Sequence, residues 1–271
     1  MKKLALLETS YRWLRQAGDA AARLVFPPQC AVCDAYLEGA LSFCARCDYA
    51  IFPLKEPRCS VCGETREVSP GAYASEDALC PQCVEARPKF ERARAYWEYY
   101  GSVADAIQRA KYGQRLWIVR NLAAELGPWF RAEIASITDA CGRSAIAELA
   151  PALLITYVPM HPGDLRARGF NFGNLLLRAC LKSAGIKPEI RRLVIKTRRT
   201  RSQAGLGHLD RRINLRGAFE VDPRVDVRGR AVLLFDDVLT TGATANEVAK
   251  TLRQAGASRV FVLSAARALK Y

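Results

Sequence analysis

The sequence lacks any long hydrophobic run. No stretch approaches the roughly 18 uninterrupted apolar residues that a membrane-spanning helix needs. At the N-terminus, the apolar stretch Leu4–Leu7 is followed at once by Glu8, so it is too short for the core of a secretory signal. We therefore expect a protein that stays in the cytoplasm. Hydrophobic residues make up 50% and charged residues 25% of the 271 residues, which excludes a wholly disordered or collagen-like chain.

Acidic residues are scarce relative to basic ones. There are 27 of the former and 41 of the latter, and the net charge is +14. The imbalance is uneven, because residues 1–86 carry a net charge of −2 and residues 87–271 a net charge of +16. A strongly basic segment attracts polyanions such as nucleic acid, nucleotides or an anionic membrane surface. The alternative is a basic background that serves solubility alone.

Cysteine, in contrast, is abundant in one short segment. Eight of the ten cysteines form four Cys-x-x-Cys pairs: Cys30/Cys33, Cys44/Cys47, Cys59/Cys62 and Cys80/Cys83. A two-residue gap lets both thiolates of a pair point at one metal ion, and two pairs complete a tetrahedral site. The four pairs therefore predict two structural zinc ions.

The same cysteines allow two other interpretations. Disulfides are rare in a reducing compartment, and a redox-active pair would lie within a βαβ pattern that is absent around these residues. Four pairs can form two sites in three ways, so the spacing leaves the pairing open, sequential or interleaved. Because each tetrathiolate site is negatively charged, the zinc segment itself is not expected to bind DNA.

Three regions are distinguishable along the chain. Residues 1–25 have the apolar spacing of an amphipathic helix, and residues 26–88 form the predicted zinc module. In residues 89–271, strands alternate with helices, which predicts an α/β domain with a parallel sheet. We expect strands at 94–100, 153–158, 231–235 and 259–264, and helices at 103–111, 116–137, 174–184 and 243–255.

The most informative stretch of this domain follows its third predicted strand. Two carboxylates end the strand, a Thr/Gly turn follows, and a helix begins. Backbone N–H groups of such a turn form a cradle for an anion, and the carboxylates can accept hydrogen bonds from ribose hydroxyls. A merely capped helix would need neither adjacent acids nor so many Thr and Gly residues. The predicted sugar-phosphate site consists of Asp236, Asp237, Val238, Leu239, Thr240, Thr241, Gly242, Ala243 and Thr244.

These residues resemble the 5-phosphoribosyl-1-diphosphate (PRPP) motif of type I phosphoribosyltransferases. Further segments are similar to the ComF family of competence proteins, as are the four Cys-x-x-Cys pairs ahead of this domain. These segments are residues 158–162, 165–171, 199–206, 212–214 and 218–219. The resemblance extends over residues 26–269 and implies a double zinc ribbon followed by a type I phosphoribosyltransferase-like domain.

The resemblance also implies a ligand and a process. It implies PRPP bound with Mg²⁺, and support for the uptake of single-stranded transforming DNA at the inner face of the membrane, with a competence helicase as partner. As a transferase, the domain would use Asp236 and Asp237 as catalytic residues. Candidate contacts for the diphosphate or a DNA backbone are Pro159, His161, Arg166, Arg168, Lys196, Arg198, Arg199 and Arg201.

Three functions fit these residues, and the sequence leaves the choice open. The first is a DNA-handling protein with a PRPP site. The second is an active phosphoribosyltransferase with an unknown nitrogenous acceptor. The third is a regulator that senses PRPP while it binds DNA. Aromatic residues such as Phe170, Phe172 and Trp97 could stack on bases or pack in the core. His161 could donate a proton at the site or merely hydrogen-bond its own loop.

Overall fold

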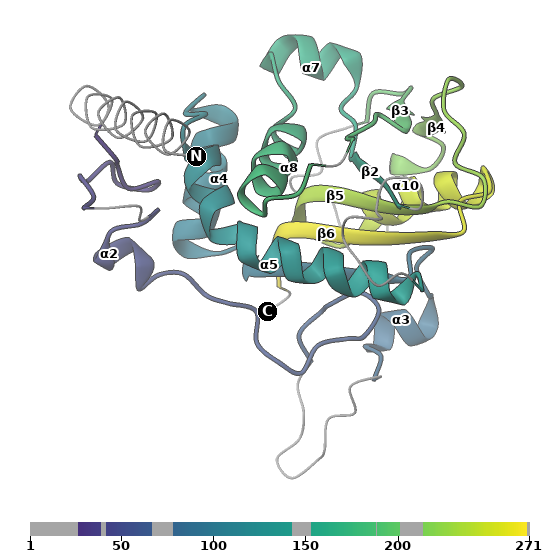
Figure 1. Ribbon diagram of the computed structural model, residues 1–271, viewed down its shortest axis with the longest axis horizontal. Helices are drawn as coiled ribbons and strands as arrows, with labels where there is room; N and C mark the ends of the chain where they lie inside the picture. Colours follow the sequence, from purple (N-terminus) through teal and green to yellow (C-terminus); the bar gives the residue numbers. More distant parts are fainter. Residues whose placement is uncertain are drawn as a thin grey trace, which may run out of the picture. The chain divides into compact units, whose positions relative to one another are not determined.

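The parallel sheet that the alternation predicts is present. Four strands pair in the order β1-β6-β5-β2, and each of these pairings is parallel. The α/β fold class is therefore confirmed (Figure 1). The strands are Arg92–Glu98 (β1), Leu153–Tyr157 (β2), Ala231–Leu239 (β5) and Arg259–Arg267 (β6).

The computed structural model describes residues 27–38, 42–66, 78–142, 153–187, 189–200 and 214–269. The predicted N-terminal helix, Arg201 and part of the arginine-rich segment lie outside these residues. The chain divides into two compact units, Met1–Ala50 and Ile51–Tyr271. The first four zinc-type cysteines belong to the first unit, and the second four share the second unit with the sheet.

Six helices of the second unit are described within these ranges. Five of them follow β-strands or connect them, and the sixth is the short α3 of the cysteine segment. They are α3 (Pro81–Glu85), α4 (Gly101–Tyr112), α5 (Ile118–Ala140), α7 (Pro162–Arg168), α8 (Phe172–Ser183) and α10 (Ala243–Gln254). The first unit contributes α2 (Ala45–Asp48).

Both faces of the central strand β5 are buried, which explains its continuous apolar sequence. Successive side chains of a strand point to opposite faces. Val232 and Leu234 lie in one apolar cluster with residues of α10, such as Val248. Phe235 instead contacts Phe130 of α5, with ring centroids 5.7 Å apart. The sheet is thus covered on both sides, and its functional groups must lie at the strand ends.

Two local features differ from the sequence-based expectation. β5 does not end before the carboxylates but continues to Leu239, because its parallel pairing with β6 extends to the pair Leu239↔Arg267. In addition, β3 (Val194–Lys196) and β4 (Phe219–Val221) form a small antiparallel pair that we did not predict. These strands have three residues each, which is too short for a detectable alternation.

Candidate sugar-phosphate site and metal centres

The adjacent strands β2 and β5 end beside one another at the edge of a cavity. The cavity measures about 760 Å³ and lies at the carboxyl ends of these parallel strands, where open α/β sheets bind ligands. It is lined by most of the residues of the predicted sugar-phosphate site. Those that line it are Asp236, Asp237, Val238, Leu239, Thr240, Gly242, Ala243 and Thr244.

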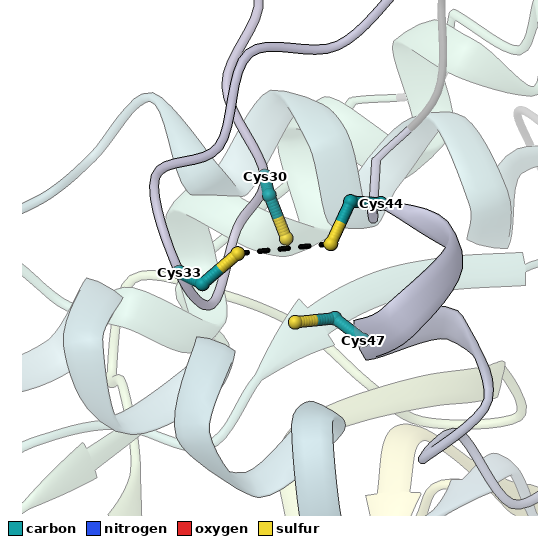
Figure 2. A group of neighbouring side chains, drawn as sticks. All are labelled: Cys30, Cys33, Cys44 and Cys47. Carbon is teal, nitrogen blue, oxygen red and sulfur yellow. Dashed lines mark hydrogen bonds between the residues drawn. The ribbon is translucent and has the colours of Figure 1, made fainter.

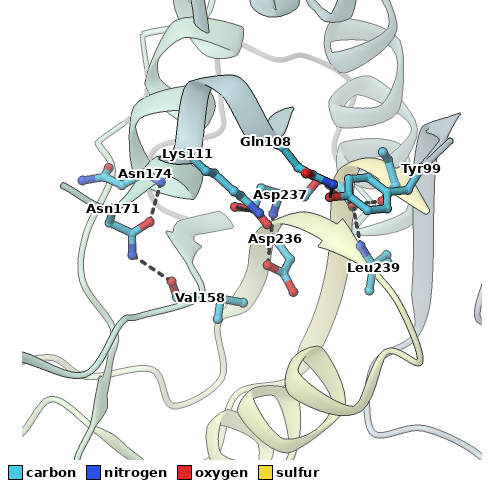
Figure 3. Close-up of polar contacts among 11 residues, drawn as sticks. Tyr99, Gln108, Lys111, Val158, Asn171, Asn174, Asp236, Asp237 and Leu239 are labelled. Carbon is cyan, nitrogen blue, oxygen red and sulfur yellow. Dashed lines mark hydrogen bonds and ion pairs between the residues drawn. The ribbon is translucent and has the colours of Figure 1, made fainter. Parts of the chain in front are cut away.

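Asp236 and Asp237 lie on the last part of β5 and are linked through the backbone. The N–H of Asp237 donates to Oδ1 of Asp236 over 3.0 Å. The neighbouring strand holds this segment in place, since the Ser264 hydroxyl donates to the carbonyl oxygens of Asp237 and Ala266. The N–H of Leu239 donates to the same hydroxyl oxygen. The carboxylates therefore project from a rigid support (Figure 3).

The two carboxylates differ in their ionisation. Burial raises the pKa of Asp236 to about 7, and the negative charge of Asp237 acts in the same direction. The positive charge of Lys111 and the hydrogen bond from the Asp237 N–H oppose this rise. Near neutral pH, the protonated and ionised forms of Asp236 therefore differ little in free energy. A side chain of this kind can change its hydrogen bonding when a ligand binds.

Lys111 is a site residue that the sequence analysis missed. It lies in the last turn of α4, and its Nζ is 2.9 Å from Oδ2 of Asp237. Its side chain also lies over the ring of Phe172, 5.5 Å from the centroid. Burial acts to lower the pKa of Lys111, but the charges of Asp237 and Asp236 outweigh it and raise the pKa. Nothing in the sequence distinguished Lys111 from other helix lysines, because its partner is 126 positions away.

The loop after β5 has the geometry of an anion cradle. Gly242 adopts a left-handed conformation, with φ of 73°, and precedes the first residue of α10. No side chain caps this helix, although the Thr241 hydroxyl accepts a hydrogen bond from the Ala243 N–H. The N-cap residue is thus Gly242, which has no side chain to bond the first N–H groups of α10. A helix N-terminus of this kind at a cavity can bind a phosphate through backbone N–H groups.

Cationic side chains line the same cavity as the carboxylates. Lys196, Arg168 and Arg199 line it, together with Pro159. The Lys196 ammonium donates to the Thr200 hydroxyl over 2.8 Å, and burial lowers the pKa of this lysine. Arg199 pairs with Asp164 at 2.9 Å. The cavity therefore combines a carboxylate pair, an anion cradle and a cationic wall.

The other predicted contacts lie away from this lining. His161 caps α7, and its Nδ1 accepts a hydrogen bond from the Gly163 N–H. Arg198 donates to the backbone carbonyls of Asn214 and Arg216, and Arg166 is exposed on α7. Phe172, by contrast, is buried with only 1% of its surface exposed, and Trp97 is buried too. Both rings therefore pack in the core instead of offering a stacking surface.

The eight paired cysteines form two separate groups. In each group the four Sγ atoms lie within 4.8 Å of one another, and the grouping is sequential rather than interleaved. The first group is Cys30, Cys33, Cys44 and Cys47, whose sulfurs converge on one point (Figure 2). The second is Cys59, Cys62, Cys80 and Cys83.

Both groups have the same local construction. The first pair lies in a tight turn, closed by Asp34 N–H to Cys30 O in one group and by Gly63 N–H to Cys59 O in the other. The second pair begins a short helix, α2 or α3. Four thiolates at this spacing match the ligand type and number of a structural zinc site. The two groups therefore fit the two zinc ions of a double zinc ribbon.

Comparison with known proteins agrees with this construction. The double zinc ribbon domain family matches residues 21–84. Competence protein F of Haemophilus influenzae is 31% identical over 213 residues, which cover 78% of this chain and 85% of that protein. The chain belongs to the competence protein F family. The DNA utilization protein YhgH of Escherichia coli K12 is a further relative of this chain. The two are 27% identical over 225 residues, which cover 78% of this chain and 90% of that protein.

This chain is also similar to a solved structure of a hypoxanthine phosphoribosyltransferase from Staphylococcus aureus. The similarity covers 54% of this chain and 61% of that one, with 13% identity and a TM-score of 0.31.

In the part of the chain that the structure describes, no helix combines the length and apolar character needed to cross a membrane.

Proposed function

We propose that this competence protein F family member binds a 5-phosphorylated ribose, with PRPP as the full ligand, and couples this binding to the handling of single-stranded DNA. One observation carries the proposal. The carboxylates of Asp236 and Asp237 and the uncapped start of α10 at Gly242 line the same cavity. A ribose phosphate presents hydroxyl donors and an anionic group, which match these two features.

Each part of the ligand has a complementary wall. The ribose hydroxyls would donate to the carboxylates, and the 5-phosphate would accept hydrogen bonds from N–H groups of the loop at residues 240–242. The diphosphate of PRPP would enter with Mg²⁺ bound to it and contact Lys196 and Arg199, which also line the cavity. The cavity volume of about 760 Å³ is within the range of small-molecule sites.

The DNA part of the proposal is supported by names and by charge. The relatives are called competence protein F and DNA utilization protein. The sheet-containing part of the chain, residues 87–271, carries a net charge of +16, and its exposed arginines include Arg166 and Arg198. A basic surface of this kind binds a nucleic-acid backbone with a strong dependence on salt. In this role a competence helicase at the inner face of the membrane is the expected partner.

Competition between the two ligands tests the proposal. Binding of a labelled single strand is measured by fluorescence anisotropy at two salt concentrations, with and without Mg²⁺ and PRPP. We expect binding that weakens as salt rises and that changes when PRPP is added. Single-strand binding that PRPP leaves unchanged would separate the two activities, and no DNA binding at low salt would contradict the DNA part.

Active transfer is the second candidate, and the cationic wall favours it. Arg168, Lys196 and Arg199 could stabilise the charge that develops on a departing diphosphate. The test is release of diphosphate from PRPP in the presence of a panel of nucleobases and amines. Release that disappears in Asp236→Asn/Asp237→Asn would support transfer, whereas no release with any acceptor would leave a binding protein.

A further inference from the structure

Lys111 occupies an unusual position for a lysine. Its side chain is only 15% exposed, and its ammonium is 2.9 Å from a carboxylate oxygen of Asp237, which is 18% exposed. Lysine is almost never buried unless it is paired. The lysine approaches from α4, whereas Asp237 lies on β5, so the ion pair connects two elements across the cavity (Figure 3).

The contact has a consequence for the carboxylate. An ammonium at one oxygen restricts the rotation of the Asp237 side chain. The ammonium bonds Oδ2 and leaves Oδ1 of Asp237 for another donor. A carboxylate with a defined orientation accepts a ligand hydroxyl without a further loss of side-chain entropy on binding. Phe172, itself buried, limits where the ammonium can move.

We propose that Lys111 is a positioning residue of the sugar-phosphate site, and that it acts through Asp237 to recognise the sugar hydroxyls. The inference rests on the proposed function and deepens it, since it separates recognition of the sugar from recognition of the phosphate. The phosphate cradle at Gly242 and the start of α10 is built from backbone groups of the loop that follows β5. The ion pair of Lys111 is instead with the side chain of Asp237, so the two recognitions are separable.

Two ligands distinguish these recognitions. Ribose 5-phosphate carries both the hydroxyls and the phosphate, whereas ethyl phosphate carries the phosphate alone. In Lys111→Met, we expect the affinity for ribose 5-phosphate to fall about tenfold and that for ethyl phosphate to change less than about twofold. Lys111→Arg, which keeps the charge and the donors, should retain ribose 5-phosphate affinity within about threefold. Affinities are measured by calorimetry or, for the weaker ligand, by NMR titration.

A double-mutant cycle tests whether Lys111 acts through Asp237. Asp237→Asn alone should weaken ribose 5-phosphate binding, and adding Lys111→Met to it should cause little further loss, because the same interaction is already broken. A direct contact between Lys111 and the ligand would instead make the two losses additive. The exposed Lys182→Met, on α8, is the charge-matched control and should change neither affinity.

The outcomes separate failure of this inference from failure of the proposed function. If the unmodified protein binds neither ligand, the proposed function fails. If it binds ribose 5-phosphate and Lys111→Met leaves that affinity unchanged, the inference is wrong. Equal losses for both ligands would also overturn it, because removal of a positive charge from the cavity would then explain the result. Thermal unfolding of each variant shows whether it is folded.

Discussion

The two cysteine groups are built alike but belong to different parts of the molecule. Each has a tight turn after its first cysteine, a short helix after its third, and four sulfurs within 4.8 Å. The first group lies in the unit Met1–Ala50, and the second in the unit that contains the sheet. A shared motif with a shared metal therefore does not imply a shared role.

The second group is joined to the sheet by specific contacts. The Ala93 N–H of β1 donates to the Val61 carbonyl over 2.7 Å, and Arg94 donates to the Ser60 carbonyl. Arg267, at the end of β6, donates to the Cys62 carbonyl and pairs with Glu64. Arg267 in turn is the sheet partner of Leu239, and the phosphate loop begins at the next residue. The second zinc turn therefore supports the strand end that carries the candidate site.

Loss of a zinc ligand should have the largest effect and should separate the two groups. Cys59 and Cys30 are matched, since each is the first cysteine of its turn and each is fully buried. We expect Cys59→Ser to lower the melting temperature of the sheet unit by about 10 °C or more and to weaken ribose 5-phosphate binding about tenfold or more. Cys30→Ser should leave that affinity within about twofold.

The measurements are zinc content, thermal unfolding and calorimetry. Each variant should retain about one of the two zinc ions of the unmodified protein. Equal losses of ligand affinity in the two variants would contradict the distinction between the groups. Zinc well below two ions per chain in the unmodified protein would contradict the metal assignment itself.

Substitutions in the two cysteine turns should have smaller effects on stability, and these effects should differ between the two groups. Gly63 has φ of 73°, and a Cβ built on it would be 2.7 Å from the Ala93 carbonyl oxygen. Gly63→Ala therefore combines an unfavourable conformation with a clash against backbone, and should cost roughly 2–4 kcal/mol of unfolding free energy. The equivalent residue of the first turn, Asp34, has φ of 62°. Asp34→Gly relieves that conformation, and its effect should remain within about 1 kcal/mol.

Chemical denaturation measures both changes, followed by near-ultraviolet circular dichroism for Gly63→Ala and by release of zinc for Asp34→Gly. Three of the four tryptophans, at 97, 117 and 129, lie in the sheet unit, so the circular dichroism signal reports mainly on that unit. A Gly63→Ala variant as stable as the unmodified protein would show that the second turn is not pressed against β1.

The smallest expected effect is a pH-dependent stabilisation that is confined to the sheet unit. The pKa of Asp236 is about 7, above its ordinary value of 3.8, so the folded state binds a proton that the unfolded state releases in this interval. The free energy of unfolding therefore falls as pH rises from about 4 to 7. Asp237 and Lys111 are the charged groups that act on this carboxyl most directly.

Asp236→Asn removes this effect, because asparagine does not ionise and can still accept the hydrogen bond from the Asp237 N–H. The substitution should stabilise the sheet unit by roughly 1–2 kcal/mol at pH 8 and by little at pH 5. Thermal unfolding at the two pH values checks this. Equal changes at both would mean that the pKa of Asp236 is not raised.

Local patterns predicted most of the fold. The apolar runs at 231–235 and 259–264 identified β5 and β6, because strands buried on both faces are apolar throughout. The cysteine spacing predicted two tetrathiolate groups, since the constraint is local. The strand extension through Asp236 to Leu239 was missed, because polar residues continued the strand only through pairing with β6.

The site was predicted only in part, for a related reason. The loop 236–244 is contiguous, and its chemistry is legible from the residues alone. Lys111 and the Arg267–Glu64 pair are contacts between residues far apart in sequence, and only the fold brings them together. Arg198 is a residue that the sequence suggested as a ligand contact because of its charge. In the structure its side chain instead donates to two backbone carbonyls.

Titration of Mg²⁺ and PRPP into the zinc-loaded protein tests the central claim most directly. Calorimetry should show one site per chain, and Asp236→Asn/Asp237→Asn should lose this binding while zinc content and folding are kept. Absence of binding to the unmodified protein, or binding that the double substitution leaves intact, would contradict the assignment of a sugar-phosphate site to the end of β5.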